Sequence, residues 1–319
     1  MLKRSLLVAG VMSLVMALSP VAPAAEQALP EGAIALPGGG YAIELKAPTP
    51  DWYTPELHRE AVRAGKQGKT IPLPEGVEVD SALLFTGIRP GSWMISPSWC
   101  TMNFVFGNPD AATPAAGPGN GNGNGGDKGN GKPKPSGGNS GVYIGTAGHC
   151  AEVGDAVTLV AAPGVLMNIG VTTKSVDNGI GDDFALIEIY PEMVQYVNPS
   201  MAIIAGPTGA KTPAFGDPIL HVGHGLGVGT GGTPRAGIVT WTGDSGPEAS
   251  GYGWDGIANL GDSGSGVRAA SGEAVGNLTH LVVGTNYLPA FIAGTNIDRI
   301  LQLASAPLAT ASLVPDPLP

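Results

Sequence analysis

The sequence predicts an all-β fold built from many short strands. The chain has 319 residues, among them 51 glycines and 29 prolines, and only 13% of its residues are charged. Such a composition favours short strands joined by turns over long helices. Because open sheet edges invite association, we expect the sheets to be closed or sandwiched. With 43% hydrophobic residues, the chain can bury a core and hold one domain of two lobes.

The first 25 residues have the pattern of a secretory signal. Lys3 and Arg4 precede an apolar stretch over residues 6–18, and small residues follow at positions 22–25. The apolar stretch is shorter than the roughly 20 residues that span a bilayer, which favours a signal peptide over the alternative of a membrane anchor. We therefore expect a secreted protein, extracellular or, if the source has an outer membrane, periplasmic.

The net charge argues against two classes of partner. The formal charge at pH 7 is −10, and the loss of Lys3 and Arg4 with the signal would make it −12. An acidic exported protein is a poor candidate for binding nucleic acid or anionic lipid. We predict neither nucleic-acid nor membrane binding, and we expect a monomer.

Residues 26–87 form an extension that is rich in proline and glycine and holds one helix signal. The helix is predicted from Pro55 to Ala64, because Thr54 can cap it, Pro55 suits its first position and Gly65 suits its exit. The extension is either a propeptide or a segment that stays attached, and the sequence leaves both open.

The remaining chain reads as two groups of strands. A stretch over residues 107–140, dominated by Gly, Asn and Pro, is predicted to be a disordered surface loop, either a spacer or a tether. Residues 297–303 are predicted to form a short helix, with a Pro- and Ala-rich tail over 305–319. The predicted strands are Ser92–Phe106, Val142–Thr146, Ala156–Val160, Val165–Val176, Asp183–Tyr190, Pro218–Val222, Arg235–Trp241, Val267–Ala269, Ala274–Thr279 and Ala290–Thr295.

Three segments carry residues that together can activate a serine. They are residues 146–150 (TAGHC), 183–187 (DFALI) and 261–266 (GDSGSG). A serine hydroxyl attacks carbonyls poorly unless a base takes its proton and a third group holds that base in the right tautomer. We assign these roles to Ser263 as nucleophile, His149 as general base and Asp183 as the orienting carboxylate.

Asp182 competes with Asp183 for the third role. Asp183 is preferred because the apolar run Phe184–Ile187 follows it directly, which puts it at the mouth of a buried strand. Asp182 would then face solvent or the loop.

The order His, Asp, Ser separates the chain from subtilisins and α/β-hydrolases. The three segments resemble the active-site blocks of chymotrypsin-like (trypsin-like) serine proteases of the secreted bacterial branch, including the cysteine directly after the histidine. The resemblance implies two antiparallel six-stranded β-barrels over residues 88–304, with a short C-terminal helix and the active site in the cleft between the barrels.

The resemblance also implies a reaction. The chain would be a serine endopeptidase that cleaves a peptide or protein substrate through an acyl-enzyme, with no cofactor and no metal. The N–H groups of Gly261 and Ser263 would form the oxyanion hole. Where the family usually reads Gly-Gly-Pro near this point, the chain reads Gly264-Ser265-Gly266; because Ser265 is small, we expect the turn to be kept.

The only two cysteines, Cys100 and Cys150, are expected to form a disulfide. Export places them in an oxidising compartment, although two buried thiols are the alternative. The resemblance places one cysteine on the strand before the histidine loop and the other beside the histidine. Such a bridge would pin the loop that carries His149.

Two further features follow from the resemblance. Arg235 is similar in position to the arginine that neutralises the aspartate before the serine in many bacterial members, so we hypothesise an ion pair between Arg235 and Asp262. Thr279, His280 and Leu281 resemble the strand that pairs with the substrate backbone. Ile257 stands near the place where trypsin-like members carry an acidic residue.

These substrate-binding residues argue against a preference for Lys or Arg and favour a small or medium apolar side chain at the cleavage site; for Leu281, simple core packing is the alternative. His221 and His224 have a spacing that could suit a metal, but no third ligand cluster accompanies them and we predict no metal site.

Two other functions stay open. One is an esterase on the same fold, and the other is a binding or adhesion module without turnover.

Overall fold

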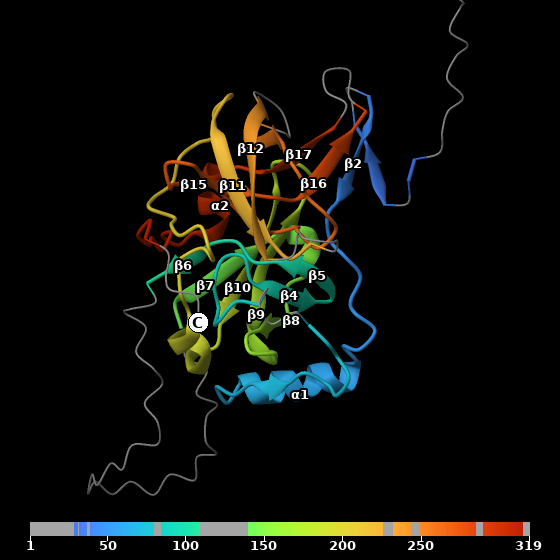
Figure 1. Cartoon of the computed structure of the whole chain (residues 1–319), viewed down its shortest axis with the longest axis vertical. Helices are drawn as coiled ribbons and strands as arrows, with labels where there is room; N and C mark the ends of the chain where they lie inside the picture. Colours follow the sequence, from blue (N-terminus) through green and yellow to red (C-terminus); the bar gives the residue numbers. More distant parts are fainter. Residues whose placement is uncertain are drawn as a thin grey trace, which may run out of the picture.

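Two antiparallel sheets, one above the other in Figure 1, make up the body of the molecule. The computed structural model describes residues 29–30, 32–36, 39–79, 84–108, 140–225, 232–243, 249–284 and 290–314. The predicted signal, residues 109–139 of the predicted loop and the last five residues of the tail lie outside the described residues. The predicted fold class, two antiparallel β units followed by a C-terminal helix, is confirmed.

The N-terminal sheet has the strand order β5-β4-β8-β9-β10-β7-β6, and β3 pairs with β9 beside this path. Its core is formed by alternate apolar side chains such as Met94, Ile144 and Leu159, all fully buried. The strands are β3 (Ile71–Pro72), β4 (Trp93–Ser96), β5 (Ser98–Thr101), β6 (Val105–Gly107), β7 (Val142–Thr146), β8 (Ala156–Ala161), β9 (Val165–Asp177) and β10 (Asp183–Ile189).

The C-terminal sheet has the order β1-β2-β16-β17-β13-β12-β11-β14-β15. Val239, Trp254 and Val267 are fully buried in its core. The strands are β1 (Ala33–Ala35), β2 (Tyr41–Glu44), β11 (Pro218–Gly223), β12 (Thr233–Thr242), β13 (Gly251–Asp255), β14 (Gly266–Ala269), β15 (Ala274–Asn277), β16 (His280–Val283) and β17 (Ala290–Thr295).

One predicted strand is wrong. Residues 92–106 do not form a continuous strand but fold into a hairpin, in which β4 and β5 pair and Ser96 faces Ser98 across Pro97. Proline has no N–H for a sheet ladder and its fixed φ suits a turn. This break adds a strand to the N-terminal sheet. Within the described residues, each sheet has seven strands besides those of the extension, in place of the expected six.

Both predicted helices are present. In α1 (Pro55–Gly65) the Thr54 side chain accepts a hydrogen bond from Leu57 N at 3.2 Å, as a cap should. α1 packs on β9 so closely that a Cβ on Gly65 would overlap the carbonyl oxygen of Asn168. The C-terminal helix is α2 (Ile297–Ala304). Among the described residues, none of the helices has the length and hydropathy that a membrane crossing needs.

The extension packs against both sheets. β2 pairs with β16 at the edge of the C-terminal sheet, whereas α1 lies against the N-terminal sheet. In Figure 1 the blue segment between them therefore passes from the upper sheet to the base of the lower one. This path takes it across the junction of the two sheets.

Candidate active site

The structure brings His149, Asp183 and Ser263 together from three distant parts of the chain. His149 lies in a single 3₁₀ turn (Gly148–Cys150) after β7, Asp183 begins β10, and Ser263 lies just before β14. The distance from His149 Nδ1 to Asp183 Oδ2 is 2.6 Å, and that from His149 Nε2 to Ser263 Oγ is also 2.6 Å. The Ser263 hydroxyl also lies 2.9 Å from the carbonyl oxygen of Thr279.

Asp183 is held at both its side chain and its backbone. Its Oδ1 accepts from Gly148 N at 2.5 Å and from His149 N at 3.2 Å, while Oδ2 faces the imidazole. Its backbone N–H donates to Thr295 Oγ1 at 3.0 Å, and its carbonyl accepts from Asn277 Nδ2, also at 3.0 Å. Sequence reasoning missed Asn277 and Thr295, since nothing local links either residue to Asp183.

Asp182 points elsewhere. It forms an ion pair with Arg299 of α2 at 2.7 Å, and its side chain is 21% exposed, whereas that of Asp183 is fully buried. Of the two aspartates, Asp183 is the one that contacts His149.

Neighbouring carboxylates favour the charged form of the His149 ring, although burial of the ring opposes it. Burial by itself lowers the pKa of His149, but the charge and hydrogen bond of Asp183, together with the charge of Glu44, raise it above its ordinary value. Burial raises the pKa of Asp183, and the neighbouring His149 more than reverses this, so that the pKa lies below its usual range. The pair is therefore arranged to stabilise an imidazolium.

His280 packs against the same pair. Its ring centroid lies 5.7 Å from that of His149, and its Nδ1 lies 3.8 Å from Asp183 Oδ2. Burial lowers the pKa of His280 to about 4, so this ring is neutral at pH 7 and adds no second positive charge. Sequence reasoning expected His280 to bind substrate; its backbone does lie on β16, but its side chain faces the histidine and the aspartate.

A pH profile tests this electrostatic arrangement. An imidazolium cannot accept the Ser263 proton, so we expect kcat/KM to be high above the pKa of His149 and to be lost below it, and Asp183 to hold that pKa above the ordinary value of histidine. In Asp183→Asn the charge that raises this pKa is removed while burial remains, so the midpoint should move to lower pH. A midpoint that stays in place or rises in that variant would contradict the role given to Asp183.

The loop before Ser263 is held by a buried ion pair. Arg235 Nη2 donates to Asp262 Oδ1 at 2.7 Å and Arg235 Nη1 donates to Oδ2, with the two side chains 8% and 0% exposed. Gly225 N and Asn259 N each donate to the same carboxylate at 2.8 Å. The hypothesised pair between Arg235 and Asp262 is confirmed.

Loss of Arg235 should be costly. Arg235→Ala would leave a buried carboxylate without its cation, so we expect the free energy of unfolding to fall by about 3 kcal/mol or more. Arg299→Ala is the matched control, because its pair with Asp182 is partly exposed and should contribute about 1 kcal/mol or less. Urea unfolding of both variants measures the difference. Equal losses of the free energy of unfolding would show that the buried Arg235 pair stabilises the fold no more than the exposed Arg299 pair.

Two N–H groups beside Ser263 converge on one carbonyl. Gly261 N and Ser263 N lie 2.5 Å and 3.2 Å from the carbonyl oxygen of Leu45, which belongs to the extension. Gly261 has φ +99°, a backbone conformation that favours glycine, and a Cβ there would meet the Trp99 ring. The predicted oxyanion donors therefore point to a common site, and a peptide oxygen occupies it.

The predicted substrate strand is paired with the extension. Thr279 O accepts from Leu45 N at 3.0 Å, and β16 pairs with β2 so that Leu281 faces Ile43. Leu281 packs against the apolar cluster that contains Leu45. The structure does not bring Ile257 into this cluster, since its side chain is 65% exposed.

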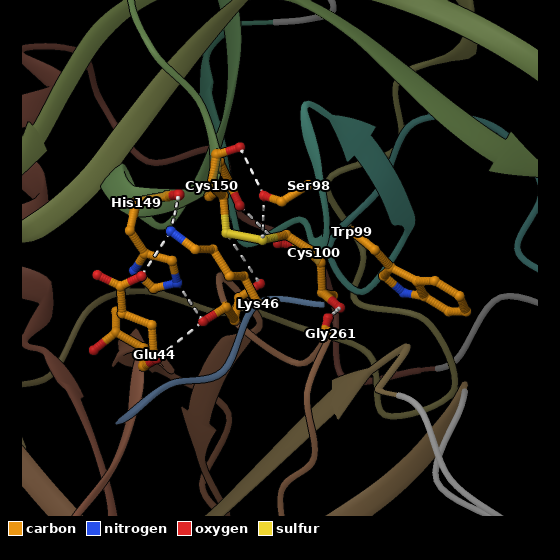
Figure 2. Close-up of a disulfide and its surroundings, with 12 residues drawn as sticks. Glu44, Lys46, Ser98, Trp99, Cys100, His149, Cys150 and Gly261 are labelled. Carbon is orange, nitrogen blue, oxygen red and sulfur yellow. Dashed lines mark hydrogen bonds and ion pairs between the residues drawn. A yellow bond between two sulfur atoms is a disulfide. The ribbon is translucent and has the colours of Figure 1, made fainter. Parts of the chain in front are cut away.

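The predicted disulfide is present. Cys100 on β5 is bonded to Cys150, the residue after His149, with their Cα atoms 6.2 Å apart. Figure 2 shows this bond directly beside His149. Ser98 Oγ donates to the Cys150 carbonyl at 3.4 Å and adds a second link between β5 and the histidine turn.

The two histidines considered for a metal have other surroundings. His221 is buried against the Trp254 ring, and His224 Nδ1 lies 2.7 Å from the carbonyl oxygen of Gly91. Within the described residues, two groups have ligand atoms close enough for a metal, and both include His149. The first contains the disulfide cysteines, and the second, with Glu44 and Asp177, would need the ring that already contacts Asp183 and Ser263.

No family model matches the chain, and no curated protein matches it. Solved structures do. The chain is similar to bacterial proteases of the chymotrypsin type. The match to Protease A of Thermobifida fusca has 18% identity, covers 70% of this chain and 98% of that one, and has a TM-score of 0.46. The values for the chymotrypsin of Cellulomonas bogoriensis are 16%, 70%, 98% and 0.41, and those for the Nocardiopsis protease are 19%, 69%, 98% and 0.44.

Proposed function

We propose that the chain is a secreted serine endopeptidase. One observation carries this proposal: the Ser263 hydroxyl is 2.6 Å from His149 Nε2, next to two N–H groups that already hold a peptide carbonyl oxygen. A nucleophile, its base and the donors for a developing oxyanion are the components that acyl transfer requires.

The mechanism follows from these contacts. Ser263 Oγ attacks the scissile carbonyl carbon while His149 Nε2 takes its proton, and Asp183 holds Nδ1–H and stabilises the imidazolium that forms. The N–H groups of Gly261 and Ser263 stabilise the tetrahedral oxyanion. His149 then gives its proton to the leaving amine, and water releases the acyl group by the same steps in reverse order.

A specific observation favours peptides over simple esters. The substrate-like segment in the site is an extended main chain that pairs with β16 on one side and with Trp99 on the other. Strand pairing of this kind uses the N–H and carbonyl groups of several peptide units, which a small ester lacks. A module that only binds would have no use for the proton path from Ser263 to His149.

The test compares substrates and traps the nucleophile. We expect the protein to hydrolyse internal bonds of extended peptides with higher kcat/KM than simple esters of the same acyl group. A labelled fluorophosphonate should form an adduct on Ser263. Faster turnover of esters alone would favour the esterase, and turnover without an adduct on Ser263 would contradict both enzymatic functions.

A further inference from the structure

The extension crosses the candidate site as a substrate would. On one side of Ser263, Leu45 N donates to Thr279 O at 3.0 Å and β2 continues the pairing along β16. On the other side, Ala47 N donates to Trp99 O at 2.9 Å and Trp99 N donates to Ala47 O at 2.8 Å. Residues 41–47 are thus held by main-chain hydrogen bonds both before and after the serine.

Leu45 is the residue whose carbonyl oxygen lies at the predicted oxyanion donors. Its oxygen accepts from both oxyanion donors, Gly261 N and Ser263 N. Its side chain is 3% exposed and belongs to the apolar cluster of the C-terminal sheet, with Ala258 and Leu281 packed at the edge of that cluster. The residue at the oxyanion donors is therefore a leucine whose side chain is already buried among apolar residues.

Lys46 follows on the far side of the serine. Its Nζ lies 2.7 Å from Glu44 Oε2 and 3.4 Å from the carbonyl oxygen of His149, and Figure 2 shows both side chains beside the histidine. With this segment in place, the side chains of His149 and Ser263 are completely enclosed. An external substrate could not reach them.

We propose that the Leu45–Lys46 peptide bond is the site at which this enzyme cuts its own chain, and that residues 41–47 block the cleft until it is cut. This inference rests on the proposed peptidase function. Ser263 Oγ bonds to the Leu45 carbonyl carbon as its proton passes to His149; the bond to Lys46 N breaks, and that nitrogen takes the proton. Water then hydrolyses the ester, leaving a Leu45 carboxylate and a free Ser263 hydroxyl.

The parts of the chain on the two sides of the cut are held differently. The piece before Lys46 is then joined to the body only by non-covalent contacts, chiefly the pairing of β2 with β16. The piece after it remains covalently attached, with α1 packed on β9. The mature chain would begin at Lys46 and keep α1, rather than begin near residue 88.

Activation would not need the new amino terminus. The Asp262 carboxylate is already paired with Arg235 and accepts from Gly225 N and Asn259 N in the uncut chain. The oxyanion donors are therefore formed before cleavage, and only the occupant of the cleft has to leave.

The experiment follows the full secreted chain over time by intact mass and N-terminal sequencing. We expect a new terminus at Lys46 in the wild type, with peptidase activity rising as the uncut form disappears, and no cut in Ser263→Ala. Leu45→Glu places a charge in the apolar cluster that holds Leu45 and should slow the cut by about 100-fold or more. Leu29→Glu is the matched control, since the Leu29 side chain is exposed in the same extension, and it should be cut at the wild-type rate.

A second variant tests the same bond in case Leu45→Glu does not fold. The Lys46 side chain is 42% exposed, so Lys46→Pro leaves the buried cluster intact while replacing the leaving amine, and it should also stay uncut. A wild type that stays whole or is cut elsewhere, or a Leu45→Glu chain cut as fast as Leu29→Glu, would overturn the processing site.

Failure of this inference can be told from failure of the proposed function. Leu45→Glu loosens the occupant of the cleft, so Ser263 in that variant should react with a fluorophosphonate whether or not the chain is cut. An adduct there, with an uncut wild type, would overturn the processing site and keep the peptidase. The absence of an adduct in every variant that retains Ser263 would overturn both.

Discussion

Replacement of Ser263 by alanine should lower kcat for peptide hydrolysis on the order of 10⁶-fold, and His149→Ala should have an effect of similar size. The two residues share one proton across 2.6 Å, so neither can act without the other. We therefore expect the double variant to be little worse than either single variant. Steady-state kinetics on an extended peptide with leucine before the scissile bond would measure all three.

Ser271→Ala is the control for this series. Ser271 is an exposed serine between β14 and β15, where its hydroxyl donates to Glu273 Oε2 at 2.6 Å, and its loss should leave kcat unchanged. Effects of Ser263→Ala and His149→Ala that multiply in the double variant would contradict a shared proton path.

Asp183→Asn should lower kcat by roughly 10⁴-fold. An amide can present its N–H to His149 Nδ1, which would place the imidazole proton on Nε2 and leave no acceptor for Ser263. The fold should survive, because the backbone of Asp183 keeps its bonds to Asn277 and Thr295. The change is therefore expected in kcat rather than in the free energy of unfolding.

Asp182→Asn is the control that tells whether the effect on kcat comes from the loss of a negative charge or from the position of Asp183. It removes the same charge one residue away, where the carboxylate pairs with Arg299, and kcat should change by only a small factor. Kinetics and urea unfolding of both variants provide the comparison. If Asp182→Asn were the more damaging of the two for kcat, the assignment of the orienting carboxylate would be wrong.

Sequence reasoning succeeded where the signal is local. The segments around His149, Asp183 and Ser263 each contain their own turn or strand signals. The predicted and observed local structures therefore differ little in these segments. The Arg235 pair could also be predicted, because the segment around Arg235 resembles the one that supplies this arginine in many bacterial members of the family. Pro97 shows the limit of a strand pattern, since one proline turned an apparently continuous segment into a hairpin.

Non-local pairing could not be predicted from residue patterns. β13 (Gly251–Asp255) has the sequence Gly-Tyr-Gly-Trp-Asp and was not predicted as a strand, yet it lies in the centre of its sheet. The path of Leu45 into the site depends on contacts with Thr279 and Gly261, more than 200 residues further along the chain. No feature of the extension alone predicts this path.

The central claim is that Ser263 carries the acyl group during turnover, and mass spectrometry of a quenched reaction tests it most directly. Acid quenching protonates His149 and stops deacylation, so an acyl-enzyme present during turnover of a slow peptide ester should be trapped. We predict an added acyl mass on the fragment that contains Ser263, localised to that residue, and none in Ser263→Ala. Product formation with the acyl group on another residue, or with no acyl group on the protein at all, would contradict the mechanism.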